Sequence, residues 1–259
     1  MKIKILTLFP DFYQNFLSSS IIGRAISRGL VEIEIINIRD YSLDKNHRVD
    51  DHPIGGGAGL IMRLEPLIDC LKANTREKTY KIFLGPKGKT YKQEDAVRLS
   101  KKEEICLICG HYEGVDARFE NYVDEELSIG DFILTGGEIA SLAITDSIVR
   151  LLDGVINSDS IKEESFNEGL LEYPQYTYPL EYDGRKIPDI LFSGNHEAVS
   201  IYHHEEALKE TYKKRSDLLK NYRYNKKDAE LLSALKAGKE IEEDKKLKRA
   251  LINGKRFIR

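Results

Sequence analysis

The sequence predicts an α/β protein, with a parallel sheet that carries helices on both faces and a small, mainly α-helical C-terminal domain after it. Short apolar or alternating runs recur along the first part of the chain, with helical segments between them. Such alternation is typical of βαβ units and a parallel sheet. The rhythm stops near residue 157, where Pro and Tyr become frequent, and long charged helical segments follow Asn195.

Alternating apolar residues at 2–9 and 31–38 predict the first two strands. Asp11 is expected to cap a helix that runs through Ile26. Gly85-Pro86 is expected to stop a third strand. The remaining segments are predicted as strands at 80–85, 104–110 and 129–137 and helices at 65–73, 91–101 and 138–152. We expect a first domain at 1–157, an interdomain linker at 158–172 and a helical domain at 173–259.

Composition limits the class of protein. Hydrophobic residues make up 41% of the 259 residues, which argues against global disorder. No apolar run approaches the roughly 18 residues that a membrane span needs, so no membrane association is expected. Three cysteines are an odd number and argue against a disulfide framework. A reducing, cytoplasmic location is therefore expected.

Charge is divided unevenly along the chain. From Lys209 to the end there are 17 Lys and Arg against 8 Asp and Glu, a net charge of +9, whereas the preceding residues sum to −12. A basic end on an acidic body suggests a polyanion, and nucleic acid is the usual partner. A solvated, salt-bridged helical face explains the same charges and stays open on composition alone.

Several short patterns resemble known sites but fail on spacing. The segment 85–90 has Phe83 where a phosphate loop needs its first glycine. Cys106 and Cys109 would point to opposite faces of a strand, which indicates core residues rather than a metal or redox pair. The run from His203 to Glu206 lacks the histidine spacing of a zinc protease helix. No dinucleotide-binding glycine pattern follows the first strand.

Three glycine-bearing loops follow apolar strands, at 84–88, 109–114 and 128–137. Ligands of open α/β sheets bind beyond the carboxyl ends of the strands, and glycine lets backbone groups approach a ligand directly. The loops are therefore candidates for one cleft, although ordinary turns between strand and helix would look the same.

Longer motifs identify a family resemblance. The matching segments are GGGAGLIM (55–62), FLGPKGK (83–89), CGHYEGVDAR (109–118), SIGDFILTGGE (128–138), ESFNEGLLEYPQYT (164–177), LFSGNH (191–196) and KKRSDLL (213–219). Together they resemble the bacterial tRNA (guanine-N1)-methyltransferases of the trefoil-knotted SPOUT superfamily, in order from residue 1 to about residue 220.

The resemblance implies a deep C-terminal trefoil knot in the sheet domain and a homodimer whose active site lies between one subunit's knot and the other's C-terminal domain. It also implies that the three loops bind S-adenosylmethionine, with magnesium assisting. The cofactor-binding residues carried over are Leu84, Pro86, Gly110, Tyr112, Glu113, Ser128, Ile129, Gly130, Asp131, Phe132, Ile133, Leu134, Gly136 and Gly137.

The implied reaction is methylation of N1 of guanosine 37 in tRNA. N1 carries a proton at neutral pH, so a carboxylate must accept it while a cation or other donor steadies charge on O6. The resemblance places the base at Glu164 and the arginine at Arg150. The family has Asp where Glu164 stands, and the extra methylene moves the carboxylate by roughly 1 Å, which can cost about a hundredfold in rate.

The same resemblance implies contacts to the substrate RNA, with the target base flipped out of its stack. The residues carried over as substrate-binding are Arg24, Ser165, Glu172, Asn195, His196, Lys214 and Arg215. The sequence departs from the family at His111, Gln175 and Tyr178, where Arg, His and Arg are usual. Alternatives are a knotted RNA-binding protein with weak or lost methyltransferase activity and another RNA methyltransferase of the superfamily.

Overall fold

A computed structural model describes residues 1–157, 164–166 and 169–238 of the chain. The chain divides into two compact units, Met1–Ile161 and Lys162–Arg259. Much of the linker predicted at 158–172 (residues 158–163 and 167–168), and the last part of the helical domain predicted at 173–259 (residues 239–259), lie outside the described residues. The predicted domain boundaries stay a prediction.

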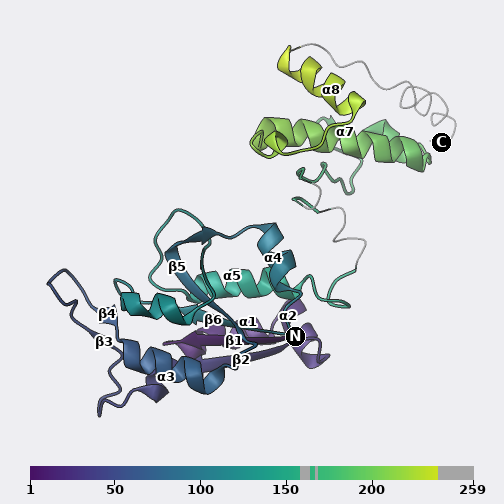
Figure 1. Cartoon of the computed structure of the whole chain (residues 1–259). Helices are drawn as coiled ribbons and strands as arrows, with labels where there is room; N and C mark the ends of the chain where they lie inside the picture. The colour runs from purple at the N-terminus through teal and green to yellow at the C-terminus, as the bar shows by residue number, and fades with distance from the viewer. Residues whose placement is uncertain (158–163, 167–168, 239–259) are drawn as a thin grey trace. The chain divides into compact units, whose positions relative to one another are not determined.

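A parallel sheet forms the centre of the first unit, with its strands in the order β2-β1-β6-β5-β7 (Figure 1). Its strands are β1 (Lys2–Thr7), β2 (Glu32–Asn37), β5 (Tyr80–Thr90), β6 (Glu104–Cys109) and β7 (Glu125–Ser128). Ile5 of β1 pairs with Ile35 of β2 and with Leu107 of β6. The predicted α/β class with a parallel sheet is confirmed.

Helices cover both faces of this sheet, as predicted, and Figure 1 shows α5 and α3 on opposite sides of the strands. One face packs against α1 (Gln14–Ser18), α2 (Ser20–Ser27), α4 (Gln93–Leu99) and α5 (Glu138–Val149). The other packs against α3 (Leu64–Asn74) and a 3-10 helix at Ala117–Tyr122.

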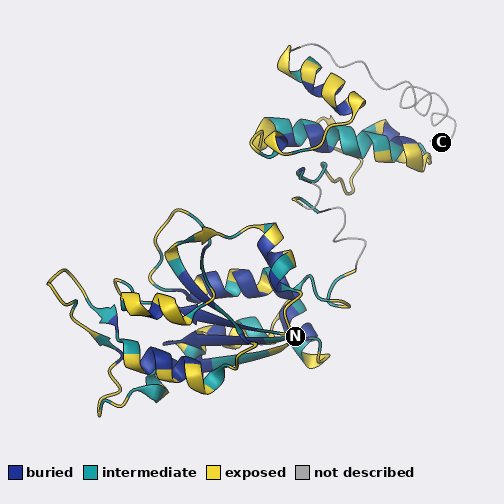
Figure 2. Ribbon diagram, viewed as in Figure 1, coloured by how far each residue is buried: buried dark blue, intermediate teal, exposed yellow. Residues whose placement is uncertain are grey.

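Strand β6 is buried on both sides, as its unbroken apolar sequence requires (Figure 2). Leu107 and Cys109 join the core beneath α5, whereas Cys106 and Ile108 join the core beneath α3. Each such leucine or isoleucine stabilises the fold by roughly 1.5 to 3 kcal/mol relative to exposure. The prediction that Cys106 and Cys109 are core residues is confirmed, because both thiols are free and buried. Burial raises the pKa of Cys109 to about 12.

Three sequence-based expectations about this unit are wrong. The helix expected from Asp11 through Ile26 is broken into a 3-10 helix at Pro10–Tyr13 followed by α1 and α2, with Ser20 at a positive φ of 50°. The strand expected at 129–137 is a loop, since β7 ends at Ser128. Gly85-Pro86 does not end β5, which continues to Thr90.

The continuation of β5 beyond Gly85-Pro86 has a simple cause. Leu84 and Lys89 both pair with Leu127 of β7, so the residues between them bulge out of the strand. The pairing with β6 ends at Leu84, and Pro86 is therefore not needed as a donor on that side. A Cβ on Gly88 would lie 2.5 Å from the Glu126 carbonyl carbon, so only glycine permits this close crossing of β7.

A small antiparallel pair, β3 (Asp50–Asp51) with β4 (Ile61–Met62), frames a glycine-rich loop in the turn-rich region after a 3-10 helix at Ile38–Tyr41. Gly55, Gly56, Gly57 and Gly59 all have positive φ. These left-handed conformations explain why the loop consists mainly of glycine.

Among its described residues, the second unit has the α-helices α7 (His196–Lys214) and α8 (Lys226–Lys236). Its other elements are the hairpin β8 (Glu181–Tyr182) with β9 (Arg185–Lys186) and 3-10 helices at Asp189–Phe192 and Leu218–Lys220. Leu208 packs with Leu219 and Leu231 between the helices. His204 Nε2 lies 2.8 Å from the buried Asp228 carboxylate and joins α7 to α8. Across the described residues of both units, no helix is long and apolar enough to cross a membrane.

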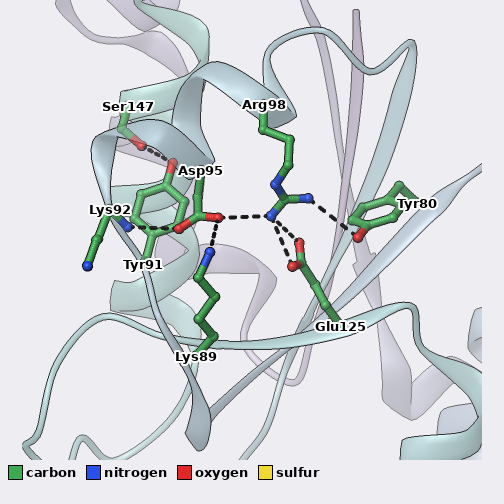
Figure 3. A network of polar contacts seen from close by, with 8 residues as sticks. All are labelled: Tyr80, Lys89, Tyr91, Lys92, Asp95, Arg98, Glu125 and Ser147. Atoms are coloured by element: carbon green, nitrogen blue, oxygen red, sulfur yellow. Dashed lines mark hydrogen bonds and ion pairs between the residues drawn. The ribbon is translucent and has the colours of Figure 1, made fainter. Parts of the chain in front are cut away.

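A polar network holds the far end of β5 in place (Figure 3). The buried Asp95 carboxylate accepts hydrogen bonds from Lys89 Nζ at 2.8 Å and from Arg98 Nη2 at 3.1 Å. Arg98 Nη2 also lies 2.9 Å and 3.0 Å from the two carboxylate oxygens of Glu125. Burial opposes ionisation of Asp95, but the hydrogen bonds from Lys89 and Arg98 outweigh it and lower its pKa. The network thus joins β5, α4 and β7.

Replacing Asp95 by Asn should lower the free energy of unfolding at pH 7 by about 1 to 3 kcal/mol. Because the folded-state pKa of Asp95 lies below its ordinary value, this stabilisation is complete above about pH 4 and is lost as pH falls through the folded-state pKa. Urea unfolding of both proteins from pH 7 down to pH 3 checks this, with the exposed Asp153→Asn as control. A difference between wild type and Asp95→Asn that does not shrink at low pH would contradict it.

Candidate functional site

A cleft of about 350 Å³ opens beyond the carboxyl ends of β6 and β7 and beside the bulge of β5 that follows Leu84. The three strands are neighbours in the sheet. The walls of the cleft are the three glycine-bearing loops. Of the predicted cofactor-binding residues, those that line it are Leu84, Pro86, Gly110, Tyr112, Glu113, Ser128, Ile129, Gly130, Phe132, Ile133, Leu134, Gly136 and Gly137. Asp131 is not among the lining residues, and it is exposed.

Two of these loops touch each other through backbone. The Gly137 N–H donates to the Gly110 carbonyl at 2.9 Å, and His111 pairs with Gly136 as an isolated antiparallel bridge. A Cβ on Gly137 would lie 2.7 Å from the Cα of Cys109. Glycine at this position is therefore a steric requirement of the loop crossing, and a larger residue would force the two loops apart.

A buried carboxylate lies beneath the same loops. Glu138 begins α5 and is only 5% exposed. One of its oxygens accepts from the Thr7 hydroxyl at 2.7 Å, and the other lies 3.2 Å from His111 Nε2. The Thr7 hydroxyl oxygen in turn accepts from the Phe9 N–H at 3.0 Å. The carboxylate therefore has one hydrogen bond and one nearby imidazole nitrogen, polar neighbours of the kind that a buried charge requires.

The wall of the cleft that carries Tyr112 and Glu113 is supported by the glycine-rich loop between β3 and β4. The Glu113 N–H donates to the Leu60 carbonyl at 3.0 Å, and Gly59 lies so close to the Glu113 side chain that a Cβ would reach within 2.5 Å of it. Arg39 Nη2 lies 3.4 Å from the Tyr112 hydroxyl, which receives the hydrogen bond. Burial, with a further contribution from Asp50, raises the pKa of Tyr112, so its hydroxyl stays protonated.

A second pocket, of about 450 Å³, lies within the second unit. It is lined by Glu164, Glu172 and His196, three of the residues carried over from the family. The Glu172 N–H donates to the Ser165 hydroxyl oxygen at 2.9 Å, which brings a fourth candidate to the same place. The structure therefore brings the candidate base together with three of the residues predicted to contact the substrate.

The other predicted catalytic and substrate-binding residues line neither the cleft nor the second pocket. Arg150 is the C-cap of α5 in the first unit, and Arg24 is exposed on α2. Asn195 caps α7, its side-chain oxygen accepting from the Ala198 N–H at 3.1 Å. Lys214 pairs with Glu210, and Arg215 binds Asp217 through two hydrogen bonds of 2.9 and 2.8 Å.

Sequence reasoning missed several lining residues. His111 and Thr135 line the cleft although neither was expected to bind the cofactor. His203 lines the second pocket and stacks on Tyr173 with ring centroids 3.6 Å apart. The sequence signal for His111 is its place inside the glycine-bearing motif. His203 has no comparable signal, because the run 203–206 matches no motif and lacks the histidine spacing of a zinc protease helix. No cluster of three or more His, Cys, Asp or Glu side chains that could hold a metal occurs within residues 1–157, 164–166 and 169–238.

The first unit is thus an α/β domain that presents a glycine-lined ligand cleft at the carboxyl edge of a parallel sheet. A family model described as tRNA (Guanine-1)-methyltransferase TrmD matches residues 1–221, and the chain belongs to this family.

Curated relatives resemble it along nearly their whole length. A tRNA (guanine-N(1)-)-methyltransferase of Clostridium botulinum (strain 657 / Type Ba4) is 51% identical over 234 residues, which cover 90% of this chain and 97% of the relative. Proteins with the same name from Clostridium tetani and Clostridium perfringens (strain SM101 / Type A) are 51% and 49% identical, again over 90% of this chain and over 98% and 100% of the relatives.

Proposed function

We propose that this chain is an enzyme that transfers a methyl group from S-adenosylmethionine to N1 of guanosine 37 in tRNA. The observation that carries the proposal is the cleft made by the CGHYEG and SIGDFILTGG segments, in a chain that matches the tRNA (Guanine-1)-methyltransferase family over residues 1–221. Relatives at about half identity bear the name of this activity, which favours it over an RNA-binding protein without catalysis.

The cleft suits S-adenosylmethionine in size and chemistry. Its volume of about 350 Å³ lies within the range of small-molecule sites. Leu84, Ile129 and Leu134 offer apolar surface for an adenine ring, Glu113 offers a carboxylate, and the glycines allow backbone groups to approach. When bound there, S-adenosylmethionine supplies a methyl group that is already electrophilic because it is carried by a sulfonium.

The chain's own residues supply the proton chemistry. Glu164 would accept the N1 proton of guanine, and Arg150 would steady the charge that develops on O6. Ser165 and Glu172, linked by their hydrogen bond beside Glu164, would hold the flipped base. Asp131 also remains a proposed cofactor contact through its family position. Magnesium assistance is implied by family resemblance only, and no step is derived through it.

The turn between α7 and α8, with the helix ends that flank it (residues 213–227), supports tRNA as the substrate. Its basic side chains are all exposed and outnumber the single exposed carboxylate, Asp217. They are Lys213, Lys214, Arg215, Lys220, Arg223, Lys226 and Lys227. Such a cluster attracts the phosphate backbone of a nucleic acid. We assign it to tRNA together with the family candidates Arg24, Asn195 and His196.

The same proposal includes a homodimer, a trefoil knot and a cytoplasmic location. Exposed apolar side chains at Phe9, Phe12 and Ile139, near the cleft, are surface that a second copy could cover. The close crossings at Gly88 and Gly137 support a knotted path. The free cysteines are in keeping with a reducing compartment.

Glu164→Gln should abolish most turnover. We expect kcat to fall by about 10² to 10⁴ because the general base is lost, while binding of S-adenosylmethionine is unchanged. The assay follows label from S-adenosylmethionine into tRNA transcripts with guanosine or adenosine at position 37. Glu163→Gln, the neighbouring carboxylate, is the matched control. Wild-type protein that binds the cofactor but labels neither transcript would refute the enzymatic proposal.

Mixing two inactive variants should restore activity if each active site combines Arg150 of one subunit with Glu164 of the other. Arg150→Gln and Glu164→Gln proteins are mixed and allowed to exchange subunits. Random exchange should recover about a quarter of wild-type activity, since half of the dimers carry one intact site. Differently tagged subunits verify the exchange, and verified exchange without recovery would exclude the shared site.

Neutralising the basic turn should weaken tRNA binding in a salt-dependent manner. For Lys220→Ala with Arg223→Ala, the slope of log Kd against log salt concentration should fall by about one for each lost phosphate contact. Turnover at saturating tRNA should stay unchanged. The control is Lys101→Ala with Lys102→Ala, two exposed lysines of the first unit. Equal slopes for both double variants would contradict the assignment.

A further inference from the structure

Glu138 joins three segments that are far apart in sequence. Its carboxylate, at the first residue of α5, receives the Thr7 hydroxyl from the end of β1 and faces His111 Nε2 from the loop after β6. The imidazole nitrogen lies 3.2 Å from a carboxylate oxygen, which can attract a ring N–H but carries no hydrogen of its own when ionised. The carboxylate also lies at a helix N-terminus, where negative charge is favoured.

His111 leaves little freedom to the loops around it. A Cβ on Gly136 would lie 2.2 Å from His111 Nε2 and 2.4 Å from Glu138 Oε2, so the ring and the carboxylate fill the space beside that glycine. The Phe9 ring contacts the imidazole from another side, with centroids 4.9 Å apart. The ring is therefore fixed between Phe9, Gly136 and Glu138.

The contact between His111 and Glu138 links the two walls of the cleft. Gly110, Tyr112 and Glu113 flank His111 on one wall, and Gly136 and Gly137 belong to the other. The backbone contacts between these walls are the single His111–Gly136 bridge and the Gly137-to-Gly110 hydrogen bond. The 3.2 Å contact between His111 Nε2 and the Glu138 carboxylate is a side-chain contact across the same junction, and the Thr7 hydrogen bond to that carboxylate links it to β1.

We propose that His111 and Glu138 are positioning residues that set the affinity of the cleft for S-adenosylmethionine by holding its two glycine-bearing walls at a fixed separation. This inference rests on the proposed function. It assigns the pair to cofactor binding rather than to methyl transfer. Loss of the imidazole donor leaves a buried carboxylate oxygen without its partner, and the wall that carries Gly136 can then move.

The experiment measures cofactor affinity by calorimetry on the full chain without tRNA, together with thermal stability and steady-state kinetics. His111→Phe keeps a ring against Phe9 but removes the donor, and we expect the Kd for S-adenosylmethionine to rise about tenfold. His111→Gln restores an N–H donor and should stay within about threefold of wild type. Glu138→Gln, nearly identical in shape, tests the acceptor and should raise the Kd about threefold or more. In every variant, the Kd for S-adenosylmethionine should change by a larger factor than kcat at saturating cofactor or the KM for tRNA.

Asp228→Asn is the matched control, because Asp228 and His204 form another buried carboxylate–histidine pair, in the second unit. It should lower thermal stability without changing the Kd for S-adenosylmethionine. An unchanged Kd in both His111→Phe and Glu138→Gln would overturn the inference. So would a rise in His111→Gln equal to that in His111→Phe, or a fall in kcat with no change in Kd. Wild-type protein that binds no S-adenosylmethionine would refute the proposed function itself, which separates the two failures.

Discussion

Close contact between backbone segments at the carboxyl edge of the sheet is the constraint on which the rest of this structure depends. Gly88 lies against the backbone of β7, and Gly137 lies against the backbone at the end of β6. At neither position is there room for a Cβ atom, so the loops can cross only where the sequence supplies glycine. The cleft exists because these crossings bring together the bulge of β5 and the loops that follow β6 and β7.

Polar side chains then hold the loops in the positions that the glycines allow. Asp95 and Arg98 hold the end of β5 beside β7, and Glu138 holds the start of α5 beside β1 and His111. Both carboxylates are buried and both have polar partners, which is the condition under which a buried charge is tolerated. The apolar core sets the layers of the domain, whereas these charged groups set the positions of the loops.

The sheet could be predicted from sequence because its strands differ in pattern for a physical reason. The unbroken apolar run of β6 indicates burial on both faces, and the alternation of β2 indicates an edge strand. The segment 129–137 was read wrongly as a strand because Phe132 and Ile133 look like core residues. They are instead 54% and 82% exposed in the cleft loop, where their apolar surface faces the ligand site. Periodicity cannot distinguish a buried strand from a loop that is apolar for binding.

The candidate site could be predicted from the sequence only in part. Motif resemblance predicted all of the cleft residues that it named except Asp131, which lies outside the lining. It predicted Glu164, Glu172 and His196 separately, and the structure places them in one pocket. The contact of His111 with Glu138 was not foreseeable, because the two residues are brought together by a loop crossing that leaves no periodic signal. The break between α1 and α2 is a local feature: Ser20 has a positive φ of 50°, and Gly23 lies so close to the Ser18 carbonyl oxygen that a Cβ would be 2.5 Å from it.

The strand order has a consequence for the newly made chain. β1 is the second strand of the sheet, yet its partner β6 ends only at Cys109. At a synthesis rate of about 5 to 20 residues per second, β6 is completed roughly 5 to 20 seconds after β1, and one edge of β1 has no strand to pair with during that time. Lys2 and Lys4 place charge on the waiting strand, a device that discourages pairing with other chains. In the folded chain Lys4 Nζ lies 3.6 Å from Glu104 of β6, so its charge gains this partner only when β6 pairs with β1.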